Sequence, residues 1–78
     1  MPKRSISIKG HRTSIALEKE FWDALDAAAE HRRVSLPSLI AEIDQSRLKA
    51  APPPGLASAL RVFVLKETQL SGVGDKAD

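Results

Sequence analysis

The basic residues near the N-terminus are the first candidates for chemistry, because no acidic residue accompanies them. Four of the twelve Lys and Arg residues fall within residues 1–17, where Asp and Glu are absent. They are Lys3, Arg4, Lys9 and Arg12. Such a one-sided cluster favours binding to a polyanion through a basic face of the protein. Two associated chains would bring together about +8 of charge in this segment.

The rest of the chain balances this charge and excludes several kinds of site. Residues 18–48 carry four basic and seven acidic side chains, residues 49–78 carry four and three, and the net charge of the 78 residues is +2. The absence of cysteine excludes disulfides and zinc–thiolate sites. Two histidines are too few for a closed metal site without carboxylates. We therefore expect no metal and no other cofactor.

Catalysis and membrane insertion are not expected either. No serine lies in a nucleophile-elbow context, and a chain this short has too little bulk to form a catalytic cleft, so we predict no catalytic residue and no enzyme. The apolar runs are shorter than a membrane span, and no signal peptide is evident. The lack of cysteine fits a reducing cytoplasm, where we place the protein. Because a domain of this size buries little surface, we expect it to form a homodimer.

Two strands joined by a tight turn explain the N-terminal pattern. The apolar residues shift from even to odd positions: Ile6, Ile8, Ile15 and Leu17. In one flat strand they would face opposite sides. A two-residue turn at Lys9 and Gly10 brings them to one face. The other face then carries Ser5, Ser7, Arg12, Ser14 and Ala16. A glycine bulge within one longer strand is the alternative.

Amphipathic helices are predicted next, at about residues 18–31 and 35–49. The first has a stripe of apolar residues at helical spacing: Phe21, Trp22, Leu25, Ala28 and Ala29. Ser35 is a favourable N-cap for the second, and three prolines at 52–54 end it. Residues 56–67 predict a short third helix, although 62–65 would equally suit a strand. Residues 68–78 are small and polar, which predicts a disordered tail.

This order of elements resembles the ribbon-helix-helix (Arc/MetJ-like) superfamily of DNA-binding regulators. The matching core is RTSIALEKEFWDALDAAAEHRRVSLPSLIAEI, from Arg12 to Ile43. The stretches GHRTSIALE, FW and SALRVFVL are similar to a bacterial ribbon-helix-helix subfamily with a C-terminal extension. The resemblance implies a mainly α fold with an N-terminal β-ribbon, in an intertwined homodimer. Its parts would be a ribbon-helix-helix domain (3–49), a Pro-rich linker (50–55), a helical extension (56–67) and the tail (68–78).

The resemblance also implies which residues bind DNA. The strands of two chains pair into a ribbon that enters the major groove, with Arg12, Ser14 and Ala16 facing the bases. Ala16 departs from the family pattern, because a methyl group can contact only a thymine methyl. The resemblance implies contacts to the DNA backbone at the start of the second helix, from Ser35, Leu36 and Ser38. The local surplus of positive charge, rather than the resemblance, favours phosphate contacts by Lys3, Arg4 and Lys9. Pro37 departs from the pattern by removing one N–H, and Arg33 replaces the usual glycine or asparagine.

The predicted function is therefore a DNA-binding transcriptional regulator whose partners are a second copy of itself and double-stranded DNA. Its implied dimer core consists of Ile15, Leu17, Phe21, Trp22, Leu25, Val34, Leu39, Ile40 and Ile43. The alternative is a protein-interaction module or antitoxin-like protein that binds a partner protein through its C-terminal extension. Candidate contacts for that partner are Leu56, Leu60 and Phe63. Ala16 and Pro37 favour the alternative, whereas the basic segment favours DNA.

Overall fold

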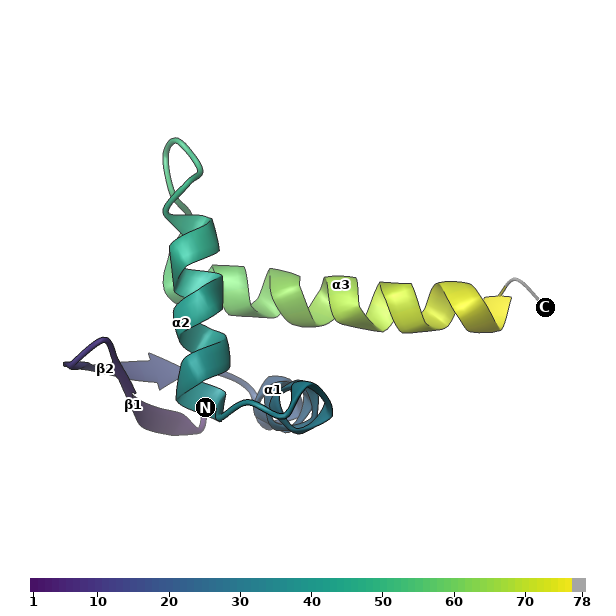
Figure 1. The fold of residues 1–78 in the computed structure, drawn as a ribbon, viewed down its shortest axis with the longest axis horizontal. Coiled ribbons are helices and arrows are strands. Elements are labelled where there is room, and N and C mark those ends of the chain that lie inside the picture. Colours follow the sequence, from purple (N-terminus) through teal and green to yellow (C-terminus); the bar gives the residue numbers. More distant parts are fainter. Residues whose placement is uncertain (77–78) are drawn as a thin grey trace.

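The chain folds into an N-terminal β-hairpin followed by three helices (Figure 1). The computed structural model describes the backbone of residues 1–76 and the side chains of residues 1–69. Strands β1 (Lys3–Ile8) and β2 (His11–Ala16) precede helices α1 (Lys19–Arg32), α2 (Leu36–Arg47) and α3 (Leu56–Lys76). In Figure 1, α3 begins beside α2 and extends away from the hairpin. The mainly helical fold with an N-terminal ribbon, expected from the sequence, is confirmed.

The two strands pair antiparallel within one chain, as the two-residue turn predicts. The register places Ile8 opposite His11 and Ile6 opposite Thr13. Lys9 and Gly10 have φ values of 51° and 82°, so both central residues of the turn are left-handed. This geometry matches the right-handed twist of the flanking strands, and it is unstrained only at the glycine. The hairpin, rather than a bulge in one long strand, therefore brings the isoleucines to one face.

One face of the hairpin closes the hydrophobic core against all three helices. The buried residues are Ile6, Ile8, Ile15, Leu17, Trp22, Leu25, Ala29, Leu39, Ile40, Ile43, Leu60 and Val64. All residues expected in a dimer core belong to this buried cluster except Phe21 and Val34. Those two are partly buried and pack against it. A single chain therefore already buries most of the side chains that the resemblance assigns to a shared core.

The turn between α1 and α2 is fixed by local hydrogen bonds. Arg33 is left-handed, with φ 58° and ψ 40°, and its N–H donates to the Glu30 carbonyl over 3.0 Å. The Val34 N–H reaches the Ala29 carbonyl over 3.0 Å, which completes a Schellman motif. Ser35 caps α2 as predicted, because its Oγ accepts from the Ser38 N–H over 3.2 Å. Both helices agree with the predicted ranges to within two residues.

The third helix is much longer than the sequence predicts. The sequence predicts a helix that ends at residue 67, but α3 continues to Lys76. The strand alternative for residues 62–65 is wrong. Leu60 and Val64 are buried against the core, so the first turns of α3 are held by packing. Once a helix is nucleated, each further residue adds a hydrogen bond at little cost. Of the tail expected at 68–78, residues 68–76 are helical and residues 77–78 lie outside the described part of the chain.

Candidate nucleic-acid interface

The hairpin has a second face that points away from the core, and we call it the outer face. Because side chains alternate along each strand, the register assigns one set of residues to it. These residues are Lys3, Ser5, Ser7, Arg12, Ser14 and Ala16. All of them are exposed except Ala16, which is half-buried. The outer face thus combines long basic side chains with small polar or methyl groups and has no carboxylate.

The three residues expected to face DNA bases lie together on β2. Arg12, Ser14 and Ala16 alternate with Thr13 and Ile15, which face the core side. None of the ion pairs within residues 1–69 involves Arg12, so its guanidinium keeps its donors for an external acceptor. The structure therefore presents Arg12 and Ser14 side by side on one exposed surface. Their contact with bases stays a prediction.

The basic residues of the N-terminal segment divide between two environments. Lys3 lies on the outer face and Lys9 lies in the exposed turn. Among the described side chains, neither lysine forms an ion pair. Arg4 lies on the opposite face. Its two terminal nitrogens donate to the Asp26 carboxylate over 3.1 and 3.2 Å, and its guanidinium lies over the Trp22 ring. A phosphate contact by Arg4, which also stays a prediction, would compete with Asp26.

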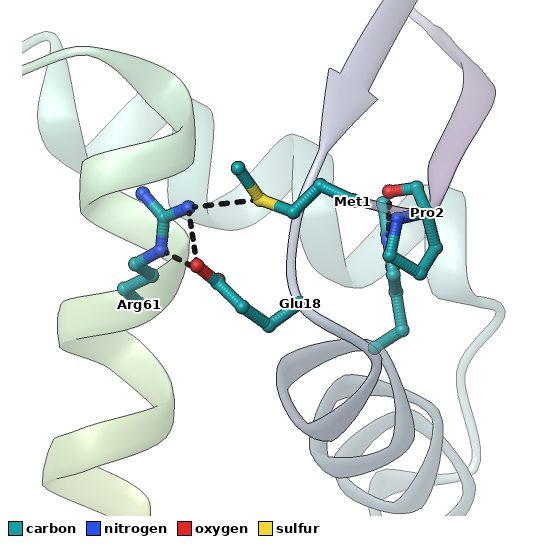
Figure 2. Close-up of polar contacts among 5 residues, drawn as sticks. Met1, Pro2, Glu18 and Arg61 are labelled. Carbon is teal, nitrogen blue, oxygen red and sulfur yellow. Dashed lines mark hydrogen bonds and ion pairs between the residues drawn. The ribbon is translucent and has the colours of Figure 1, made fainter.

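The N-terminus anchors the open end of the hairpin to α1 and α3. The Pro2 carbonyl accepts from the Leu17 N–H and from the Trp22 Nε1–H, each over 3.1 Å. Figure 2 shows Arg61 of α3 reaching Glu18 and the Met1 sulfur. The Arg61 Nε lies 3.1 Å from the Glu18 carboxylate. These contacts fix the position of the hairpin relative to both helices. The outer face therefore lies on a pair of strands that is held in place at its open end.

The Glu18 carboxylate in this anchor has an altered acidity. Its pKa is lowered from the ordinary value of 4.5, first by a hydrogen bond with its own backbone and second by the hydrogen bond from Arg61. Opposing this, partial desolvation raises the pKa, but the hydrogen bonds dominate. Glu18 precedes α1, whose first free N–H groups carry partial positive charge, but its side chain makes no capping hydrogen bond there. The carboxylate instead faces α3.

The start of α2 offers fewer backbone donors than the resemblance implies. Pro37 has no N–H, and the Ser38 N–H already donates to Ser35 Oγ. Among the described residues, no group accepts a hydrogen bond from the Leu36 N–H. A phosphate at this helix end would therefore meet the Leu36 N–H and the exposed hydroxyls of Ser35 and Ser38. Phosphate contacts by these three residues stay predictions.

The C-terminal helix uses its expected partner-binding residues largely for its own domain. Leu60 is fully buried, and Leu56 and Phe63 are partly buried against the core. The Arg32 guanidinium lies 4.9 Å from the centre of the Phe63 ring and pairs with Glu67 over 2.8 Å. A groove of about 410 Å³ runs between α2 and α3, bounded in part by Ile43 and Val62. It is lined by mostly apolar and charged side chains.

Other kinds of site find no support in the described part of the chain. Within residues 1–69 no group of three or more His, Asp or Glu side chains is placed to hold a metal ion. No helix among the described residues is both long and apolar enough to cross a membrane. His11 lies at the hairpin turn and His31 near the end of α1, and both are exposed.

Two residues of the outer face received no role from the sequence. Ser5 and Ser7 lie on β1, directly opposite Ser14 and Arg12. The alternation of the strand already placed them on this face. However, the resemblance assigns base contacts to the second strand alone, and the contacts predicted on β1 belong to its basic residues, Lys3 and Arg4. The signal that identifies them is the pairing of the two strands within the chain.

Comparison with known proteins agrees with this geometry. A protein-family model described as a ribbon-helix-helix domain matches residues 1–68. The matched range contains the hairpin, α1, α2 and the core-facing turns of α3. Curated proteins and solved structures give no match.

Proposed function

Because the chain belongs to the ribbon-helix-helix domain family, we propose that it is a transcriptional regulator that binds DNA as a homodimer. Domains of this family are typically DNA-binding regulators, and the family is not an enzymatic one. In this proposal the outer face of the hairpin enters the major groove of an operator in the bacterial cytoplasm. Bound dimer then blocks transcription by occupying the site, including at the protein's own promoter.

The observation that carries the proposal is the exposed pair of Arg12 and Ser14 on a face without acid. An arginine can donate two hydrogen bonds to guanine O6 and N7, and a serine hydroxyl can donate or accept. Ala16 adds a methyl group that can contact thymine. Each bidentate contact discriminates between bases by roughly 1–3 kcal/mol. Arg12 is therefore the residue that we expect to contribute most to a preference for particular DNA sequences.

The DNA backbone would be bound by groups around this ribbon. Lys3 and Lys9 are exposed and supply charge, and the start of α2 supplies Ser35, Leu36 and Ser38. Arg4 belongs to this set if it exchanges Asp26 for a phosphate. Each phosphate that a cation neutralises releases counterions, so binding weakens steeply as salt rises.

The dimer in this proposal forms through the free edge of β2. Among the described residues, β2 has a strand on one side only, namely β1. Antiparallel pairing of β2 with its copy satisfies the backbone groups of that edge and creates a two-fold axis.

Val62 and Leu65 remain exposed on α3, with relative exposures of 46% and 56%. Burial of such apolar residues would add to the dimer interface.

Fluorescence anisotropy of the purified protein against a pool of genomic fragments tests the proposal. We expect tight binding to a subset of fragments that survives moderate salt and is lost in Arg12→Ala. Arg12→Lys is the matched control: it keeps the charge but loses the bidentate fork, so it retains weak general binding and loses the preference. Weak binding to every fragment, abolished by salt and indifferent to Arg12, refutes specific regulation.

A second candidate function is a protein-interaction module or antitoxin-like protein that uses α3. The exposed Val62 and Leu65 favour it, because apolar residues on one helix face often contact a partner. Against it, Leu60 and Val64 hold the same helix to its own core. A protein that binds no DNA fragment and loses a co-purifying protein in Leu65→Glu would support this function instead.

A further inference from the structure

We propose that Ser5 and Ser7 of β1 bind DNA phosphates and thereby set the depth of the ribbon in the groove. The inference rests on the proposed function and deepens it, because it gives a role to the strand that pairs with β2 inside the chain. The chemistry involved is hydrogen bonding from two neutral hydroxyls to phosphate oxygens on the walls of the major groove.

The first step is the position of the two serines in the sheet. Ser7 lies directly opposite Arg12, and Ser5 lies directly opposite Ser14. Cross-strand neighbours on one face have Cβ atoms about 5 Å apart. Both serines are exposed and share the outer face with the residues proposed to contact bases. Any DNA that meets Arg12 and Ser14 therefore lies close to Ser5 and Ser7.

The second step compares the width of the sheet with that of the groove. In a dimer paired through β2, the sheet has four strands spaced about 4.8 Å apart, so β1 lies about 7 Å from the two-fold axis. The major groove is about 12 Å wide, which gives it a half-width of about 6 Å. Strand β2 thus fits over the bases, whereas β1 lies over the groove wall. The groups it meets there are phosphates and sugars.

The third step is the kind of side chain that this position accepts. Serine hydroxyls are frequent donors to DNA phosphates. They are also short, so β1 can approach the wall without lifting Arg12 away from the bases. Within residues 1–69, neither serine hydroxyl takes part in a side-chain hydrogen bond. A larger or acidic residue at either position would keep the ribbon out of the groove.

The fourth step is the rigidity of β1. Its start is held by the Pro2 carbonyl, which accepts from Leu17 and Trp22. Arg4, between the two serines and this anchor, is fixed by Asp26 and Trp22. Ile6, between Ser5 and Ser7, is buried in the core. The strand therefore does not need to be ordered on binding, which lowers the entropic cost of each phosphate contact.

Binding of Ser5→Ala, Ser7→Ala and Ser7→Glu to a preferred and an unrelated fragment tests the inference. We expect each alanine variant to lose about tenfold in affinity for both fragments, since a hydrogen bond to a charged phosphate is lost. The preference between fragments and the slope of log Kd against log salt stay unchanged, because no charge is removed. Ser7→Glu loses considerably more. Ser46→Ala, at an exposed serine of α2, is the control.

Two results would overturn the inference. Unchanged affinity in both alanine variants would show that β1 does not touch DNA, and an altered base preference would show that it reads bases instead. Both results leave the proposed function intact if Arg12→Ala still abolishes the preference. If the wild-type protein itself shows no preference and no dependence on Arg12, the proposed function fails, and this inference fails with it. Circular dichroism confirms that each exposed-site variant is folded.

Discussion

The Arg4 guanidinium lies over the Trp22 indole, with 4.7 Å between the guanidinium carbon and the ring centre. The same group pairs with Asp26. Arg4 and Arg12 are both arginines of one basic hairpin, yet they face opposite sides of it. Arg4 contributes to the contact between β1 and α1, whereas Arg12 is available to an external ligand. This division gives the two residues different expected phenotypes.

Arg4→Ala is expected to lower the free energy of unfolding by about 1 kcal/mol. An exposed cation–π contact contributes about 0.5–1 kcal/mol, and a half-exposed ion pair adds little more. Arg12→Ala is the matched control and should change stability by less than about 0.5 kcal/mol. Urea denaturation followed by circular dichroism measures both. Equal effects in the two variants would show that Arg4 does not bind α1 in solution.

Leu60→Ala is expected to destabilise the protein by about 2–5 kcal/mol, because it opens a cavity in a fully buried site. Leu65→Ala removes the same atoms from an exposed position of the same helix and should cost less than about 0.5 kcal/mol. Thermal and urea unfolding of both variants give the comparison. A Leu60→Ala protein as stable as Leu65→Ala would mean that α3 does not pack on its own domain.

Arg33→Gly is expected to raise the free energy of unfolding by about 1 kcal/mol. Arg33 adopts the left-handed conformation that ends α1, and a residue with a Cβ pays roughly 1–2 kcal/mol there. Glycine avoids that penalty but loses some of the gain through the entropy of the unfolded chain. Arg33→Ala retains the Cβ and should show no such increase. A destabilised Arg33→Gly would indicate that the arginine side chain makes a contact that outweighs the strain.

The lowered pKa of Glu18, caused first by the hydrogen bond with its own backbone and second by the hydrogen bond from Arg61, predicts a loss of stability in acid. Because the pKa of Glu18 is lowered in the folded state, the unfolded chain takes up the proton first as pH falls. The stabilisation is therefore present above the ordinary value of 4.5 and disappears as pH falls through the lowered pKa. Urea midpoints from neutral to acidic pH should fall less in Glu18→Gln than in wild type.

A matched variant controls for the general effect of removing an acid. Glu42 takes part in none of the ion pairs of residues 1–69. Glu42→Gln should therefore retain the acid sensitivity of the wild-type protein. If Glu18→Gln and wild type lose stability in parallel, the contact between Glu18 and Arg61 does not contribute to folding.

Local patterns predicted much of the fold and the arrangement of the candidate site. The change in apolar positions around Lys9 and Gly10 predicted the hairpin, because strand alternation and turn geometry involve only neighbouring residues. The cap by Ser35 follows from equally local chemistry. Membership of the family, shown by the match to residues 1–68, agrees with the resemblance drawn from the sequence.

Contacts between distant segments could not be predicted in the same way. Arg4 meets Asp26 across 22 positions and Arg61 meets Glu18 across 43, so neither pair leaves a periodic trace in the sequence. The length of α3 also escaped prediction. Its later residues have little helical pattern of their own, and they continue a helix whose first turns are fixed by packing of Leu60 and Val64.

The most direct test of the account is a titration of isotope-labelled protein with a preferred DNA fragment, followed by amide NMR shifts. We predict that the largest changes fall on β1 and β2, at residues 3–16, with smaller ones at the start of α2. Residues 62–65 of α3 should change little. Shifts concentrated on α3 with an unperturbed hairpin would contradict the central claim that the outer face of the hairpin binds DNA.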